Sequence, residues 1–514
     1  MLFSEVVATS DAVRSNASRK AKIAALARSL AAAGADELPA VVAWLSGDTT
    51  QDRLGTGWRT LLGIDVPPAA TPGLAIGAVE AVLDELADTA GPGSVARRRE
   101  LLEGLMAAAT TAERDFLIRL LTGELRQGAS AALVGDAVAL AAGVPVELVR
   151  RALMLSGRLP VTARAALTGG AAALAEFRLE VGRPLQPMLA TPGGTLDEAM
   201  AEFDGAVSLE QKLDGARIQV HRAGERVWVF TRTLRDITAT VPELVELVAG
   251  LPCSSVVLDG ETLALTDAGR PRPFQETMSR FALDPALVAA QPKSARDLLL
   301  HPFFFDCLHL DGTDLLDAPL AERRAALETV AGPHCIPVLQ RPGPTAAADY
   351  VAATLRAGHE GVMVKSLSAP YAAGRRGRAW LKLKPTHTLD LIVLGAEWGY
   401  GRRTGYLSNL HLGARDPDGG PPIMVGKTFK GLTDALLRWQ TTEFPAHERA
   451  RDAHAVYLRP ELVVEIALDG VQVSTRYPGG AALRFARVIR YRPDKTAADA
   501  DTIDAVRALL PGVG

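Results

Sequence analysis

The apolar positions of residues 1–185 recur at the spacing of α-helices. Ile23, Leu26 and Leu30 fall on one helical face. Ser18 precedes this face as a candidate N-cap. Gly- and Pro-rich segments separate it from further apolar faces of the same kind, and no fixed repeat period is present. The pattern predicts an all-α N-terminal domain over residues 1–185.

The pattern changes after the Gly- and Pro-rich residues 182–194, which we interpret as a linker. Apolar and polar residues then alternate over residues 216–231 around a central turn, which predicts a β-hairpin. Short apolar runs predict further buried strands, which cover residues 256–258, 303–305 and 362–364. Helical segments lie between these runs. We therefore expect an α+β domain over residues 186–385.

The last part of the chain, residues 386–514, is expected to be rich in short strands. Strand-like runs cover residues 389–395, 423–425 and 462–468, with many Gly, Pro and Asp turns between them. One helix is predicted near residues 433–441. Several short strands with one helix among them are typical of a small β-barrel of the OB type. The complete expectation is thus a multidomain protein with three parts.

Length and composition agree with this division and limit the protein's location. The 514 residues suggest three domains of about 150 residues each. No apolar run reaches the ~20 residues of a membrane span, and the N-terminus has no basic segment followed by an apolar one. The three cysteines form no Cys-x-x-Cys pair, which argues against structural zinc and disulfides. These features predict a cytoplasmic protein with no membrane partner.

The net charge of −3 by itself argues against a nucleic-acid partner, but the distribution of basic residues changes this view. Residues 365–384 contain six basic side chains and no acidic one, and residues 476–495 contain six basic side chains and one acidic one. Only 10 of the 56 basic residues are lysines. Since arginine is the usual choice in this chain, the lysine positions are the more informative ones.

The strongest local motif surrounds Lys212, in the segment Glu210-Gln-Lys-Leu-Asp-Gly-Ala-Arg217. A lysine can be deprotonated and act as a nucleophile, whereas arginine stays charged. Crowding by Arg217, Arg232 and other cations is expected to lower the pKa of Lys212. A charged surface hairpin is the alternative interpretation. Four fixed positions in one short segment seldom arise by chance, which favours a catalytic role.

This motif resembles that of the covalent nucleotidyltransferases, the superfamily of ATP-dependent DNA ligases, RNA ligases and mRNA capping enzymes. Six further blocks resemble the superfamily's later motifs in the same order: Thr231–Arg232, Leu258–Glu261, Phe304–Asp306, Glu360–Lys365, Trp380–Lys384 and Arg492–Lys495. The N-terminal helices, with Leu-Arg-Gln-Gly at residues 125–128, resemble the DNA-binding domain of the larger ATP-dependent DNA ligases. The layout is similar to the three-domain ligases of high-GC bacteria, archaea and eukaryotic nuclei.

The resemblance implies a role for each candidate site residue. Lys212 would attack ATP, Phe305 would stack on adenine, and Glu210 would accept from the adenine amino group. Glu261 and Glu360 would bind Mg²⁺, which agrees with the cost of placing carboxylates beside buried strands without a cation. Glu261 would also contact the ribose. The remaining ATP contacts would be Arg217, Arg232, Lys365, Arg376, Lys382 and Lys384, and the pyrophosphate contacts would be Arg492, Asp494 and Lys495. The alternation of Lys382 and Lys384 with leucines places both lysines on one face of a strand.

The implied partner is nicked double-stranded DNA, encircled by the three domains of a monomer and contacted mainly through its backbone. The implied reaction seals nicks through a lysyl-AMP intermediate and serves DNA replication, repair or recombination. An RNA ligase or a GTP-using capping enzyme is the first alternative, but neither requires the helical domain. An NAD-dependent ligase would carry a cysteine zinc module. A non-catalytic DNA-binding protein would not need Lys212, both glutamates and Lys382 together.

Overall fold

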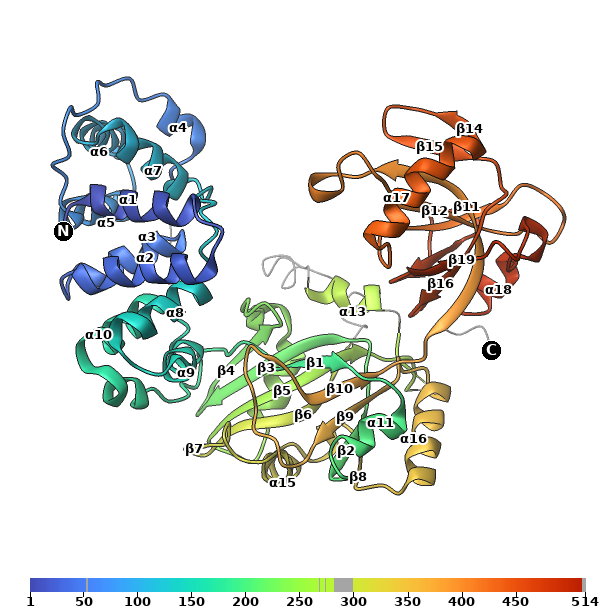
Figure 1. Cartoon of the computed structure of the whole chain (residues 1–514). Helices are drawn as coiled ribbons and strands as arrows, with labels where there is room; N and C mark the ends of the chain where they lie inside the picture. Colours follow the sequence, from blue (N-terminus) through green and yellow to red (C-terminus); the bar gives the residue numbers. More distant parts are fainter. Residues whose placement is uncertain (52–53, 268, 273, 282–298, 511–514) are drawn as a thin grey trace.

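The computed structural model describes residues 1–510 except 52–53, 268, 273 and 282–298. It confirms the three-part organisation, with a helical part, a middle part of two sheets flanked by helices, and a strand-rich part (Figure 1). The helical and strand-rich parts lie at opposite sides of the middle part. Within the described residues, no helix combines the length and the apolar character needed to cross a membrane.

The N-terminal part consists of helices packed around an aromatic centre. Its helices are α1 (Phe3–Arg14), α2 (Arg19–Ala32), α3 (Leu38–Ser46), α4 (Trp58–Leu62), α5 (Ile76–Asp88), α6 (Ser94–Ala108), α7 (Thr111–Leu121), α8 (Ala131–Ala142), α9 (Val146–Ser156) and α10 (Leu159–Ala175). Phe3 packs edge-to-face on Trp44 and Phe116, with ring centroids 5.4 and 5.5 Å apart. Ser18 caps α2, as predicted, by accepting from the backbone N–H of Ala21.

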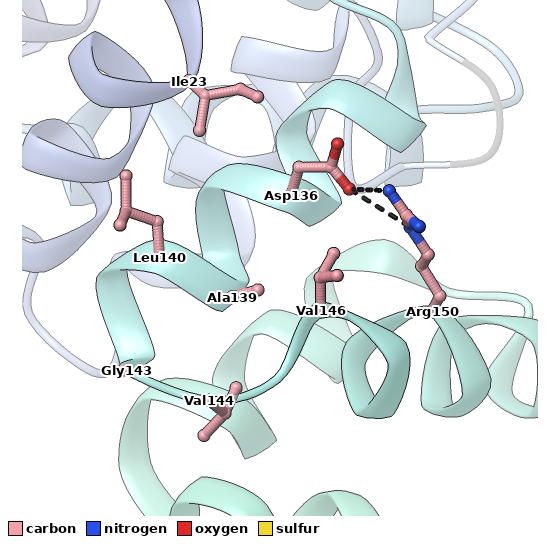
Figure 2. Close-up of a pocket in the computed structure, with 8 residues that line it drawn as sticks. All are labelled: Ile23, Asp136, Ala139, Leu140, Gly143, Val144, Val146 and Arg150. Carbon is pink, nitrogen blue, oxygen red and sulfur yellow. Dashed lines mark hydrogen bonds and ion pairs between the residues drawn. The ribbon is translucent and has the colours of Figure 1, made fainter. Parts of the chain in front are cut away.

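Helices α2, α8 and α9 meet at Asp136. Its carboxylate accepts from Arg19 of α2 at 2.6 Å and from Arg150 of α9 at 2.8 Å. Figure 2 shows the apolar hollow beside this contact, into which Ile23 and Leu140 project. All residues lining the hollow belong to the helical part, so it is not shared with the nucleotidyltransferase motifs.

The middle part holds two sheets, with the strand orders β1-β10-β9-β2-β8 and β4-β3-β5-β6-β7. Its elements are β1 (Leu189–Pro192), α11 (Leu196–Ala201), β2 (Val207–Gln211), β3 (Ala216–Ala223), β4 (Arg226–Thr231), α12 (Pro242–Ala249), β5 (Ser255–Ala264), α13 (Phe274–Phe281), β6 (Leu300–Leu310), β7 (Thr313–Asp314), α15 (Leu320–Ala331), β8 (Val338–Gln340), α16 (Pro344–Arg356), β9 (Val362–Ser366) and β10 (Arg376–Leu383). The predicted hairpin is β3 and β4, with Val220 opposite Val229. Strands β5 and β6 extend well beyond the predicted apolar runs, because buried polar residues such as Asp259 continue them.

The third part is built mainly from antiparallel strands. Its elements are β11 (His387–Trp398), β12 (Leu407–Ala414), β13 (Ile423–Thr428), α17 (Asp434–Glu443), β14 (Glu448–Arg451), β15 (Ala455–Leu458), β16 (Val463–Leu468), β17 (Gly470–Val473), β18 (Ala481–Arg484), β19 (Arg487–Tyr491) and α18 (Ile503–Arg507). The main sheet has the order β13-β12-β11-β15-β14, with β16 pairing β11 and β19. No closed ring of strand pairs is found in the described part of the chain, so the barrel form of the predicted OB fold stays a prediction.

Candidate active site

The chain around Lys212 is fixed by backbone hydrogen bonds at the end of β2. The Lys212 N–H donates to the carbonyl of Gly361 at 2.8 Å, and the N–H of Glu360 donates to the carbonyl of Lys212 at 3.1 Å. Backbone hydrogen bonds therefore hold Lys212, the predicted nucleophile, next to Glu360, the predicted metal ligand, although 148 positions separate the two residues. The structure thus brings together two motifs that the sequence places far apart.

The turn after Lys212 depends on Gly215. A Cβ atom at this position would lie 2.4 Å from the carbonyl oxygen of Thr262 and 2.9 Å from Cγ of Glu261. Both neighbours belong to β5, whose backbone cannot retreat without breaking its pairing with β3. Gly215 therefore allows the nucleophile's turn to lie directly against the strand that carries Glu261.

Replacing Gly215 with alanine is expected to destabilise the middle part by about 1–3 kcal/mol, because the added methyl group overpacks a closed contact. Thermal unfolding measures this as a lower melting temperature. The matched control is Gly104→Ala in the exposed centre of α6, where a Cβ would meet no atom within 4 Å. That change should stabilise the protein by up to about 1 kcal/mol. Equal effects of the two changes would contradict the close approach at Gly215.

Glu360 is the centre of a group of cations. Its Oε2 contacts the amines of both Lys212 and Lys384, the latter at 2.8 Å. Burial acts to raise the pKa of Glu360, but the two lysines outweigh it, and the pKa lies below its ordinary value. Glu360 is therefore an ionised carboxylate that pairs with the Lys212 side chain.

The crowding of Lys212 by Arg217 and Arg232 stays a prediction. Arg217 pairs with Asp259, and Arg232 is exposed just after β4. The crowded cation is Lys382 on β10. Burial, followed by the charges of Lys212, Lys384 and Arg376, lowers its pKa. These four side chains form a cationic cluster suited to a polyphosphate.

Glu261 lies on β5 directly opposite Arg217 of β3. Burial raises the pKa of Glu261 to about 7, against the opposing charges of Arg217 and Lys212. A half-buried carboxylate whose pKa is raised this far is poorly compensated by the protein alone, which fits it to a bound cation. Glu261 and Glu360 would both offer the hard oxygen ligands that Mg²⁺ prefers. The residues present therefore fit the implied metal.

A buried cluster of charged and aromatic side chains lies between the two sheets of the middle part, where the implied purine pocket would form. Glu210 on β2 and Lys365 on β9 form an ion pair of 2.5 Å, and both side chains are 2% exposed. The Lys365 amine lies 4.3 Å from the ring centre of Phe305 and 4.2 Å from that of Trp380. Phe304 belongs to a separate core cluster, whereas Phe305 belongs to the cluster that also holds Trp380.

Glu210 retains a free oxygen in this pocket. Its Oε1 atom is buried and has no hydrogen-bond partner among the described residues. Burial raises the pKa of Glu210, an effect that Lys365 partly offsets. An unpartnered buried acceptor beside an aromatic ring is the chemistry that an amino group on a flat base would satisfy. The pocket thus matches the implied purine site.

Two residues of the third part reach this site and were not singled out by the sequence. Arg484, at the end of β18, donates to Asp214 at 2.8 Å and lies 3.5 Å from Glu360. Asp469 lies 3.5 Å from the amine of Lys384. Arg484 belongs to the basic stretch 476–495, but nothing in the sequence shows that it faces Asp214.

The predicted pyrophosphate residues lie elsewhere in this arrangement. Arg492 and Lys495 pair with Asp390 of β11 at 3.0 and 2.5 Å, and Asp494 pairs with Arg492 at 2.6 Å. All of these contacts lie within the third part. The structure therefore does not bring Arg492, Asp494 and Lys495 to Lys212, and their role stays a prediction that requires a different placement of the third part.

The polar contacts of Arg484 are expected to hold the third part against the middle part. Ion pairs of this partly exposed kind contribute on the order of 1 kcal/mol. Arg484→Ala should therefore populate open arrangements several-fold more in the DNA-free protein, which small-angle X-ray scattering detects as a larger radius of gyration. Arg490→Ala is the matched control, because Arg490 pairs with Glu465 inside the third part. An unchanged scattering curve for Arg484→Ala would contradict this prediction.

Models of three protein families match most of the chain. The ATP dependent DNA ligase domain matches residues 187–384. The DNA ligase N terminus matches residues 59–139, and the ATP dependent DNA ligase C terminal region matches residues 403–495. The matches follow the order of the three parts of the structure.

Similar whole proteins are also known. A probable DNA ligase of Nocardia farcinica (strain IFM 10152) is 73% identical over 523 residues, covering 99% of this chain and 100% of that protein. A probable DNA ligase of Rhodococcus jostii (strain RHA1) is 68% identical, covering 100% of both chains. The solved structure named Pmar-Lig_PreS3 is 17% identical and has a TM-score of 0.56, covering 95% of this chain and 99% of that chain. The last match supports the three-part fold.

Proposed function

The chain belongs to the ATP-dependent DNA ligase family, and we propose that it seals nicks in duplex DNA through an adenylate carried on Lys212. The observation that carries this assignment to the lysine is its place in the cationic cluster. Lys212 is held by Glu360, and Lys382, Lys384 and Arg376 gather beside it.

In the first step the Lys212 amine forms a bond to the α-phosphorus of ATP, and the bond to the β-phosphate oxygen breaks to release pyrophosphate. Attack requires an unprotonated amine, so the Lys212 side chain must first leave Glu360 and give up its proton to solvent. Lys382 and Lys384 would stabilise the charge on the phosphates. Glu261 and Glu360 would hold Mg²⁺, which supplies further neutralisation of phosphate charge when bound.

The adenylate then passes from Lys212 to the 5′-phosphate of the nick. The 3′-hydroxyl attacks this activated phosphate, a new phosphodiester forms, and AMP leaves. We infer that Phe305 stacks on the adenine throughout, with Glu210 accepting from the amino group. Arg217, Arg232, Lys365 and Arg376 would complete the contacts to ATP. Arg492, Asp494 and Lys495 would meet the pyrophosphate only after the third part has turned.

We further infer that the substrate is a nicked duplex encircled by one copy of the chain, with the parts divided near residues 185 and 385. Backbone contacts would dominate, because sealing requires no sequence selection. The three free cysteines favour a reducing cytoplasm, and the enzyme would act in replication, repair or recombination.

A nick-sealing assay tests the function directly. The purified chain is incubated with Mg²⁺ and a duplex that carries a single labelled nick, with either ATP or GTP. We expect sealing with ATP only, and on DNA more readily than on an all-RNA nick. Labelling of the protein by GTP, or preference for RNA ends, would favour the capping-enzyme or RNA-ligase alternative. Duplex binding without labelling or sealing would favour a non-catalytic protein.

A further inference from the structure

Tyr371 is a buried residue that none of the nucleotidyltransferase motifs includes. It lies in the connection between β9 and β10, and 4% of it is exposed. Its hydroxyl donates to Asp259 Oδ2 at 2.5 Å and accepts from the backbone N–H of Met188 at 3.0 Å. Burial and the charge of Asp259 raise the pKa of Tyr371 well above its ordinary value, so the hydroxyl remains a donor.

The hydroxyl of Tyr371 lies where the two sheets of the middle part meet. Asp259 is on β5 of one sheet. The connection that carries Tyr371 joins two strands of the other sheet, and Met188 directly precedes β1 of that same sheet. One oxygen atom therefore hydrogen-bonds to the walls on both sides of the proposed nucleotide pocket.

Arg217 hydrogen-bonds to the same two residues, Asp259 and Met188. Its Nε and Nη2 atoms donate to Asp259 at 3.0 and 2.6 Å, and its Nη1 donates to the Met188 carbonyl at 2.7 Å. The guanidinium lies 5.3 Å from the ring centre of Phe305 and 5.7 Å from that of Trp380. The position of Arg217 thus depends on Asp259 and on Met188, and Tyr371 is bonded to both.

Asp259 is fully buried, so its orientation is decided by its donors. Arg217 supplies two of these hydrogen bonds and Tyr371 supplies the third. Without the third donor, the carboxylate and the arginine could shift together. The Met188 N–H would also lose its acceptor. The backbone at Met188, whose carbonyl accepts from the Arg217 guanidinium, would then be held less firmly.

We propose that Tyr371 is a positioning residue for ATP, which fixes Arg217 through Asp259 and Met188 and so sets the geometry between the two sheets at the nucleotide pocket. This inference rests on the proposed function, because it requires that ATP binds beside Arg217. Tyr371 touches neither ATP nor the reacting atoms. Its loss should therefore weaken ATP binding while the chemistry at Lys212 proceeds.

The test is Tyr371→Phe, which removes one oxygen atom. Labelling of Lys212 by ATP radiolabelled at the α-phosphate is measured over a range of ATP concentrations. Rates are normalised to the fraction of protein that becomes labelled at saturation, so that unfolded protein does not contribute. We expect the KM for ATP to rise about tenfold, as for loss of one hydrogen bond to a charged group. The rate at saturating ATP should stay within about twofold of wild type.

Tyr457→Phe is the matched control. The hydroxyl of Tyr457 also donates to a carboxylate, Asp452, at 2.9 Å, but on the surface of the third part. This variant should leave the KM for ATP unchanged. Wild-type protein that takes no label would refute the proposed function. Wild-type protein that takes label, combined with an unchanged KM in Tyr371→Phe, would refute the role of Tyr371 alone.

A double-mutant cycle separates positioning from a general loss of stability. Arg217→Lys removes the two-point contact with Asp259 and should raise the KM for ATP by itself. If Tyr371 acts through Arg217, the double variant should raise KM no further than Arg217→Lys does. Multiplicative effects would overturn the proposal. So would a fall in the sealing rate of Tyr371→Phe on a saturating pre-adenylated nick, since that reaction needs no ATP.

Discussion

Lys212→Arg is expected to abolish the transfer of label from α-phosphate-labelled ATP to the protein. The side chain keeps its positive charge and can still pair with Glu360, so the fold should be preserved. Arginine cannot be deprotonated in a protein and offers no amine nucleophile. The rate of lysyl-AMP formation should fall by at least about a thousandfold, as for removal of other covalent nucleophiles.

Two controls separate loss of the nucleophile from loss of the site. Lys20→Arg, on an exposed position of α2, makes the same chemical change away from the pocket and should label normally. Lys212→Arg should still seal a nick whose 5′-phosphate is already adenylated, because that step needs the phosphate-binding cations but not the amine. Retained labelling in Lys212→Arg would refute the assignment of Lys212. Loss of sealing on the pre-adenylated nick would instead show damage to the pocket.

Much of the site could be predicted from sequence because its chemistry is concentrated in short segments. Lys212 and Gly215 lie within one turn, and strand alternation is consistent with Phe304 and Phe305 lying in different clusters. Such local patterns depend on strand periodicity, which the sequence carries directly. The three-part fold followed in the same way from the change between helical and strand periodicity.

Contacts between distant segments could not be predicted in this way. The sequence shows Asp259 and Tyr371 as unrelated residues, although their side chains share a hydrogen bond. It likewise placed Arg484 in a general basic stretch, whereas the structure pairs it with Asp214. The sequence also does not show that Arg217, only five positions after Lys212, pairs with Asp259, because that contact depends on the register of the folded sheet.

Glu261→Gln is expected to stabilise the free protein at high pH. The pKa of Glu261 is about 7 in the folded protein against 4.5 for the unperturbed group, so the folded state binds this proton more tightly than the unfolded chain. Below about pH 4.5 the group is protonated in both states and costs nothing. As pH rises from about 4.5 to 7, the buried charge progressively destabilises the fold, by up to about 3 kcal/mol. Glutamine cannot ionise, so the variant does not lose this stability as the pH rises.

The melting temperature of Glu261→Gln should therefore exceed that of wild type at pH 8, and the difference should vanish toward pH 4.5. Glu225→Gln, at the exposed turn between β3 and β4, is the matched control and should change stability by less than about 0.5 kcal/mol. A Glu261→Gln variant that is less stable than wild type at pH 8 would contradict the buried, poorly compensated carboxylate.

The same substitution should disable the enzyme, which makes the stability gain diagnostic of function. If Glu261 holds Mg²⁺ and the ribose as proposed, a neutral amide cannot replace it, and labelling of Lys212 should fall by about a hundredfold or more. Added Mg²⁺ and a non-hydrolysable ATP analogue should raise the melting temperature of wild type more than that of Glu261→Gln, because binding stabilises only the form with the carboxylate. An equal ligand-induced rise in the melting temperature of both proteins would contradict the assignment of Glu261 to the metal and ribose site. A more stable but inactive variant would show that the Glu261 carboxylate lowers the stability of the fold and is required for activity.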